Sequence, residues 1–273
     1  MILCRMSALA ATALTLGLAG PAWSATPMAP AAVQPPSQAL PQRARATDEE
    51  RRLVARLEPL ARAAFWAREA ELDPRDAQAG VGLAQALRTM GNFTDAAEAA
   101  GRVLVTSPDN IEALLESARA HIGAGAGFYA IEPARHAQTL APKDWRPVAL
   151  LAVAYEQVSR DEEALAAHKL AVSLAPNDPA PLSNLALWYA GHGQASMAED
   201  LLRTAITKPG ATIAMRQNLT LLLGLQGRFD EAEKLARQDL PPEAVANNMA
   251  YLKAAFPGAT GTGRSWDSVR TAQ

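Results

Sequence analysis

A proline followed by a small polar cluster returns every 34 residues along this chain. The stretch LAPND, residues 174–178, has a near copy, LAPKD, at residues 140–144. A spacing that is kept through four occurrences indicates an internal repeat, and this restricts the fold to architectures built from one repeated unit. The four prolines are Pro74, Pro108, Pro142 and Pro176.

Blocks of 34 residues that start at Ala77 place residues of the same kind at equivalent positions. The pattern is typical of two antiparallel helices joined by a short turn, because small residues let the helices approach closely and the closing proline ends the second helix. At one turn we expect Ser159 to Glu162 (SRDE) to form a capping box. The small position of the first helix is occupied by Ala84, Ala118, Ala152, Ala186 and Thr220. The turn position is occupied by Gly91, Gly125, Ser159, Gly193 and Gly227. The small position of the second helix is occupied by Ala96, Ala130, Ala164, Ala198 and Ala232.

The composition favours an all-α fold. Ala and Leu, which are strong helix formers, dominate the apolar half of the chain, and aromatic residues make up only 5% of it. The 34-residue pattern is similar to the tetratricopeptide repeat (TPR). This resemblance implies a right-handed superhelical solenoid of TPR helix pairs with a C-terminal capping helix. The expected solenoid, 48–256, comprises a degenerate first repeat at 48–76, repeats at 77–110, 111–144, 145–178, 179–212 and 213–244, and a cap at 245–256.

The N-terminus is predicted to be a cleaved signal peptide at 1–24. An uncharged stretch follows Arg5, and Ala22-Trp23-Ser24 suits a signal peptidase. A membrane anchor is the weaker alternative, because the apolar run is shorter than the ~20 residues that span a bilayer. A Pro/Ala-rich linker at 25–47 and a disordered tail at 257–273 are expected to flank the solenoid.

No motif predicts catalysis, a metal site or a cofactor. The stretch GAGAGF, 123–128, lacks the Gly-Lys-Ser/Thr of a phosphate loop and lies at an inter-helix turn. The four histidines have no metal-ligand spacing, and the only cysteine, Cys4, lies in the signal peptide. A formal charge of −2 argues against binding to nucleic acid or to an anionic membrane surface. We therefore expect neither a small-molecule substrate nor catalysis.

The groove lined by the first helix of each repeat is the expected binding surface, with a protein or peptide as partner. Amide and guanidinium groups suit recognition of peptide backbone and carboxylates, although ordinary solvated polar residues would give the same pattern. Asn184, Trp188 and Asn218 are the preferred contacts, and Arg119 and Arg146 are expected to meet an acidic partner. The predicted groove residues are Gln85, Arg88, Arg119, Arg146, Glu156, Asn184, Trp188, Gln217 and Asn218, with Glu112 also facing the groove.

The segment 216–252 carries a more specific resemblance. Its runs RQNL, GLQGRFDEAE, ARQDLPPE and NNMAYL closely resemble the C-terminal part of the TadD-type TPR proteins of tight-adherence (Flp) pilus assembly. That family implies a non-catalytic adaptor for a pilus-machine component such as the outer-membrane secretin. Its members are usually lipoproteins, but here Pro21 occupies the position of the lipidated cysteine. We therefore expect a soluble periplasmic protein that meets the outer membrane only through its partners.

Two other classes of protein compete with this interpretation. One is a general periplasmic TPR adaptor for envelope division or cytochrome maturation, which a co-purifying partner would distinguish. The other is an enzyme with a repeat domain, which is disfavoured because no segment of the chain is left over to house a pocket.

Overall fold

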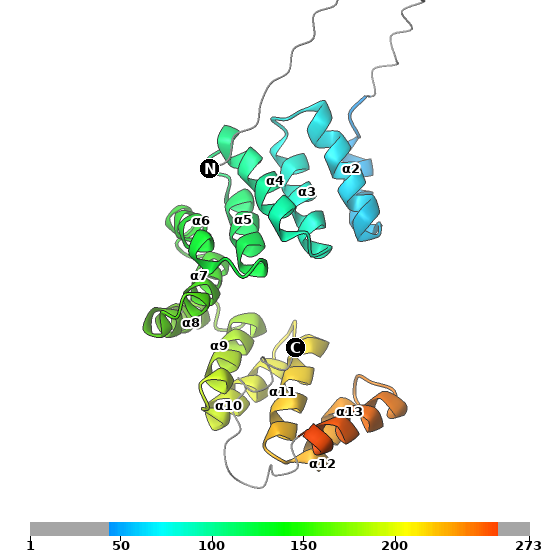
Figure 1. The fold of residues 1–273 in the computed structure, drawn as a ribbon, viewed down its shortest axis with the longest axis vertical. Coiled ribbons are helices and arrows are strands. Elements are labelled where there is room, and N and C mark those ends of the chain that lie inside the picture. The colour runs from blue at the N-terminus through cyan, green and yellow to red at the C-terminus, as the bar shows by residue number, and fades with distance from the viewer. Residues whose placement is uncertain (1–43, 256–273) are drawn as a thin grey trace, which may run out of the picture. The chain divides into compact units, whose positions relative to one another are not determined.

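A computed structural model describes residues 44–255, and all regular structure in this range is helical. The predicted signal peptide, most of the linker and the tail lie outside the described residues. The helices (Figure 1) are α1 (Asp48–Leu53), the 3₁₀-helix η1 (Val54–Arg56), α2 (Pro59–Leu72), α3 (Ala77–Thr89), α4 (Phe93–Thr106), α5 (Ile111–Gly123), α6 (Gly127–Leu140), α7 (Trp145–Gln157), α8 (Asp161–Leu174), α9 (Pro179–Gly191), α10 (Ala195–Ile206), α11 (Ile213–Leu225), α12 (Phe229–Ala236) and α13 (Pro242–Ala255).

The helices stack in chain order as pairs. From α2 onward each helix packs against the next one along the chain. The first helices, α3, α5, α7, α9 and α11, each begin 34 residues after the previous one, and each also packs against the first helix of the following pair. Within 44–255 the second helices make no comparable contact with one another. The first helices therefore line one continuous surface, which we call the first-helix face, and the prediction of an all-α solenoid of helix pairs is confirmed.

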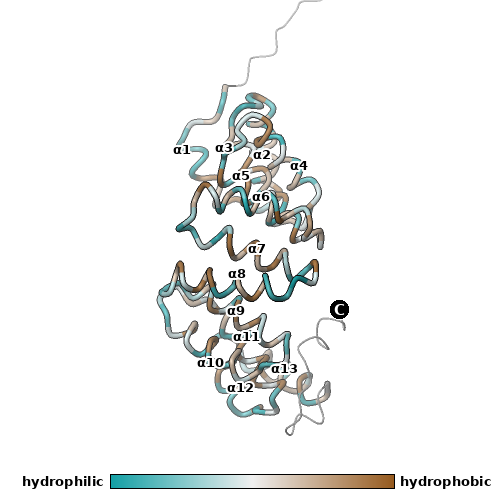
Figure 2. Tube along the Cα trace, turned by 90° about the vertical axis from the view of Figure 1, so that its left-hand side faces the viewer, coloured by the Kyte–Doolittle hydropathy of each residue, from teal (hydrophilic) through white to brown (hydrophobic). Residues whose placement is uncertain are grey.

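The alanine positions of the repeat are the points of closest helix approach. Ala84, Ala118, Ala152 and Ala186 are completely buried, and so is every member of the second-helix alanine set, from Ala96 to Ala232. A larger side chain at these positions would hold the helices apart. Apolar residues recur along each helix between hydrophilic stretches (Figure 2), as the stacking of amphipathic helices requires.

The turn positions share one backbone conformation. Gly91, Gly125, Gly193 and Gly227 have φ between 71° and 80°, and Ser159 has φ of 57°. The residue after each of them donates its N–H to a carbonyl five residues back, as in the bond from Arg160 to Tyr155, which is the Schellman arrangement. The capping box predicted at Ser159 is therefore wrong: Arg160 is the N-cap of α8, and no side chain caps that helix.

At the N-terminal end of the described helices, a buried carboxylate accepts several hydrogen bonds. Glu69 of α2 is 1% exposed and accepts hydrogen bonds from the Ala46 amide, at 3.0 Å, and from Arg51 of α1, at 2.9 Å. Burial acts to raise the pKa of Glu69, but these bonds and one from Arg68 outweigh it and hold the pKa below its usual value. Thr47 forms a capping box with Glu50 at the start of α1. The last residues assigned to the linker are thus part of the folded unit.

At the C-terminal end, α13 packs against α11 and α12 through Val245, Met249 and Leu252, all of which are buried. This is the face expected of the capping helix, although the helix already begins at Pro242 and Phe256 lies outside the described residues.

Most of the buried apolar residues of the described chain fall into three clusters. The largest runs from Ala118 to Leu252. A second consists of five alanines and Leu83 from α2, α3 and α4, and the third contains Leu114, Leu115 and Ala137.

Candidate binding face and its two cavities

All nine predicted groove residues lie on first helices. Gln85 and Arg88 belong to α3, and Arg119 belongs to α5. The remaining residues are Arg146 and Glu156 on α7, Asn184 and Trp188 on α9, and Gln217 and Asn218 on α11. Their surroundings differ from the expectation at several positions.

Trp188 does not present an open ring. Its side chain is 7% exposed, and the ring of His192 stacks on it at 3.9 Å between centroids with an interplanar angle of 18°. Tyr189 contacts it edge-on at 5.2 Å. The prediction that this indole grips a partner side chain with its flat face is therefore wrong, because the residue one helical turn later already covers that face.

The groove arginines are paired within the protein. Arg88 and Arg119 both bind Glu116 of α5, which is 1% exposed, and the Arg88 Nε lies 2.7 Å from one of its oxygens. Since Glu116 already neutralises part of their charge, Arg119 in particular is not the free cation that was expected.

Arg146 is held in the same way. It binds Asp144 at 2.7 Å and Glu112 at 2.9 Å. The bond to Asp144, reinforced by Glu112, raises the pKa of Arg146 above its usual range. Burial acts to raise the pKa of Asp144, but its bonds to Arg146 outweigh this and lower it. Glu112 and Arg146 occupy equivalent positions of consecutive repeats, so opposite charges 34 residues apart were the signal that could have revealed this pair.

A small polar cavity lies between α7, α8 and α9. Its volume is about 150 Å³, and it brings together three predicted residues, Glu156, Asn184 and Trp188. It also contains His168 of α8, which is 1% exposed and whose Nε2 lies 2.5 Å from the Glu156 carboxylate. A carboxylate only accepts hydrogen bonds, so we assign the proton to Nε2. The Nδ1 of His168 and the indole nitrogen of Trp188 are buried without a hydrogen-bond partner among residues 44–255.

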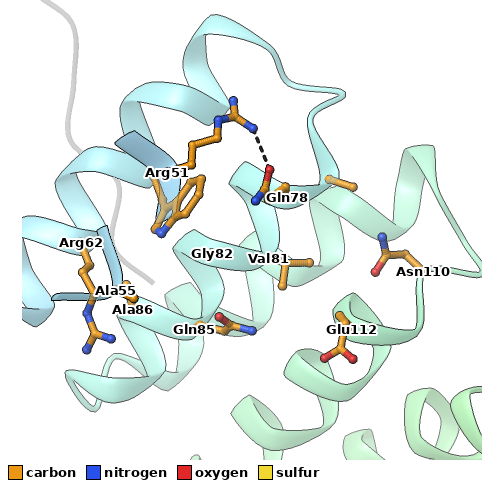
Figure 3. Close-up of a pocket in the computed structure, with 12 residues that line it drawn as sticks. Arg51, Ala55, Arg62, Gln78, Val81, Gly82, Gln85, Ala86, Asn110 and Glu112 are labelled. Carbon is orange, nitrogen blue, oxygen red and sulfur yellow. Dashed lines mark hydrogen bonds between the residues drawn. The ribbon is translucent and has the colours of Figure 1, made fainter. Parts of the chain in front are cut away.

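A larger cleft, of about 470 Å³, opens at the N-terminal end of the first-helix face (Figure 3). Its lining includes the predicted residues Gln85 and Glu112, together with three residues that the repeat pattern did not single out, Arg51, Arg62 and Trp66. These three come from α1 and α2, the part of the chain where the repeat is degenerate, so the comparison of equivalent positions gave no signal for them.

The floor of the cleft is shaped by one close approach. A Cβ atom on Gly82 of α3 would lie 2.6 Å from the Trp66 ring, so glycine at this position lets the ring lie directly against α3. The guanidinium of Arg51 lies 5.8 Å from the centre of the same ring and donates to Gln78 at 3.0 Å, the bond drawn in Figure 3.

Residues 44–255 contain no group of three or more His, Cys, Asp or Glu side chains placed to hold a metal ion. None of the helices in this range is long and apolar enough to cross a membrane.

Comparison with known proteins supports the repeat assignment. A family model described as tetratricopeptide repeat matches residues 212–240. No match to a curated protein sequence was found.

Several solved structures have a similar fold. A thermophilic TPR protein of Thermus thermophilus is 19% identical with a TM-score of 0.57, covering 63% of this chain and 96% of its own. A TPR protein of Parabacteroides merdae is 15% identical with a TM-score of 0.59, covering 76% of this chain and 80% of its own. MamA of Desulfovibrio magneticus RS-1 is 19% identical with a TM-score of 0.50, and the match covers 58% of this chain and 90% of the MamA chain. Such similarities show a superhelical TPR-like fold.

Proposed function

We propose that this tetratricopeptide-repeat protein is a periplasmic adaptor in the assembly of a tight-adherence (Flp) pilus. Its first-helix face binds a protein component of the pilus machine, such as the outer-membrane secretin. The observation that carries the binding role is the pair of cavities on that face, which gather polar side chains beside apolar walls on a fold that otherwise consists of packed helices.

The pilus assignment rests on the segment 216–252. In the structure this segment spans most of α11, all of α12 and most of α13. Arg216 of the RQNL run and Asp239 of the ARQDLPPE run bind each other through two hydrogen bonds, at 2.7 and 2.5 Å. The hydrogen bond from Arg216 lowers the pKa of Asp239. Two of the runs that carry the family resemblance are therefore in contact in the folded protein.

The proposed location follows from the N-terminal sequence. A chain cleaved near Ala25, with Pro21 in place of a lipidated cysteine, is released into the periplasm without an acyl group. Intact-mass measurement of the fractionated mature protein tests this proposal. A retained Met1 or a lipid-sized additional mass contradicts it.

The experiment for function replaces Asn184 and Asn218 together by alanine in the full chain, expressed in a deletion strain. Both are partly buried residues on the first-helix face, and neither has a side-chain hydrogen bond within 44–255. We expect a normal far-UV circular dichroism spectrum, loss of surface pili and loss of cross-links to the partner. The matched control replaces Asn92 and Asn177, which are exposed and lie outside the helices.

Normal piliation of the double variant shows that the two amides are ordinary solvated residues. A deletion strain that still assembles pili at normal levels removes the pilus assignment and leaves the scaffold fold with a different partner.

A further inference from the structure

The large cleft exists because the first repeat is incomplete. Each first helix from α3 to α11 has 13 residues, whereas α1 has six and is followed only by the three residues of η1. Along the array each first helix packs against the next, but within the described residues neither α1 nor η1 packs extensively on α3. Part of the surface that a complete helix would cover is left open, and that surface is the wall of the cleft.

Arg62 of α2 carries charge that the protein does not neutralise. Arg51, Arg88, Arg119 and Arg146 are all held by carboxylates of the chain. The Arg62 side chain, by contrast, has no ion pair or hydrogen bond with any residue of 44–255, and its Nε is buried from solvent. Arg62 lines the cleft, so a ligand that enters the cleft can meet this uncompensated charge. A carboxylate fits best, because it gives a charge-assisted bond.

The other charged residues of the lining are already neutralised, and the rest of it is apolar apart from the amides Gln78, Gln85 and Asn110. Trp66, Val81 and Ala86 provide the apolar wall beside Arg62. Arg51 is neutralised by Glu69 and Asp76, at 2.9 and 2.6 Å. Glu112, the one carboxylate in the lining, is bound by Arg146. The cleft therefore offers one uncompensated positive charge next to an aromatic and aliphatic surface.

We infer that this cleft binds a segment of a partner protein in which one carboxylate lies beside an apolar side chain. The carboxylate binds Arg62, and the apolar side chain packs on Trp66 and Val81, where the missing turns of the first helix would have lain. The volume of about 470 Å³ is within the range of sites that hold a small ligand or a few side chains. This inference deepens the proposed function, since it names the chemistry of the bound segment.

The test uses two probe peptides, acetyl-Ala-Leu-Glu-Leu-Ala-amide and the same peptide with Gln in place of Glu. Titration into the purified protein is followed by NMR through the Trp66 indole N–H, which a Trp66→Phe variant identifies. We expect the Glu peptide to shift this resonance and to bind at least about tenfold more tightly than the Gln peptide, because only the Glu peptide makes a charge-assisted bond. The Arg62→Gln variant should lose this preference.

The matched control is Arg102→Gln, which removes an exposed arginine of α4 that has no ion pair within the described chain and should retain the preference. Equal binding of the two peptides, no shift of the Trp66 resonance by either at millimolar concentration, or an unchanged preference in Arg62→Gln overturns the inference. The assay contains no pilus component, so a failure of the pilus assignment leaves its result intact. A failed peptide titration likewise leaves the Asn184 and Asn218 experiment standing.

Discussion

Replacing serine by glycine at one turn, and glycine by serine at another, measures how much free energy a side chain costs in the left-handed backbone conformation of these turns. Ser159 is the one non-glycine residue within 44–255 that has a positive φ, at 57°. A side chain in this left-handed region costs roughly 1–2 kcal/mol, and glycine loses about 0.5–1 kcal/mol of additional chain entropy on folding. The Ser159 hydroxyl makes no hydrogen bond to the described chain that could be lost. We therefore expect Ser159→Gly to raise the free energy of unfolding by about 0.5–1 kcal/mol.

The reverse exchange is Gly125→Ser. Gly125 has φ of 71°, and a Cβ built there meets no atom within 4 Å, so only the backbone conformation resists the new side chain. We expect the free energy of unfolding to fall by a similar amount, about 0.5–1 kcal/mol. The two substitutions should thus change stability in opposite directions although each exchanges the same two residue types.

The assay is urea denaturation of both variants and the parent protein, followed by far-UV circular dichroism. A stability change shifts the midpoint and leaves the dependence on urea concentration unchanged. If Ser159 were a helix cap, Ser159→Gly would lower or leave unchanged the free energy of unfolding, since glycine is a slightly poorer cap than serine. That result, or changes of the same sign in the two variants, would refute the turn assignment.

Three further predictions concern the core and its charges. Ala164→Leu should lower the free energy of unfolding by about 1–3 kcal/mol by overpacking a helix crossing, while Ala166→Leu at an exposed site of the same helix should have little effect in the same denaturation assay. Glu116→Ala should lower the free energy of unfolding by about 2–3 kcal/mol, because it leaves two arginines unpaired. This is less than the loss expected for a fully buried pair, because both arginines reach solvent. A decrease below about 0.5 kcal/mol in urea denaturation would contradict this prediction. Burial acts to raise the pKa of Glu199, but bonds from Arg228 and Arg203 lower it below its ordinary value of 4.5. The stabilising contribution of Glu199 is therefore complete above that value and is lost as the pH falls through the lower pKa of the folded state. The free energy of unfolding of Glu199→Gln should thus decline less between about pH 5 and about pH 3 than that of the parent protein.

The repeat geometry could be predicted because each position has a local requirement that recurs five times. The completely buried second-helix alanine, such as Ala164, recurs in every repeat, and the left-handed turn residue is glycine in four of the five, as at Gly91. Ser159 was misinterpreted because the sequence SRDE satisfies the capping pattern as well as the turn pattern, and only the backbone conformation distinguishes them.

The pairing of Glu116 with its two arginines could not be predicted in the same way. The position of Glu116 is occupied by Gly82, Leu150, Asn184 and Asn218 in the other repeats, so the repeat pattern carries no information about its partners. Its two arginines come from one turn away on α5 and from 28 residues earlier on α3. Such pairs depend on how neighbouring repeats are oriented, which a single sequence does not encode as a periodic signal.

The buried core of α2, α3 and α4 is separate from the long central cluster. Five alanines and one leucine form it, with Trp66, Leu87 and Met90 packed against them, so these helices can fray without opening the long central cluster. Trp66 packs on this small core and also lines the cleft, so a segment bound there adds contacts that are lost when the end frays. Binding of a segment in the cleft should therefore slow amide hydrogen exchange in α2 and α3, and the exchange rate of these two helices would show whether the cleft is occupied.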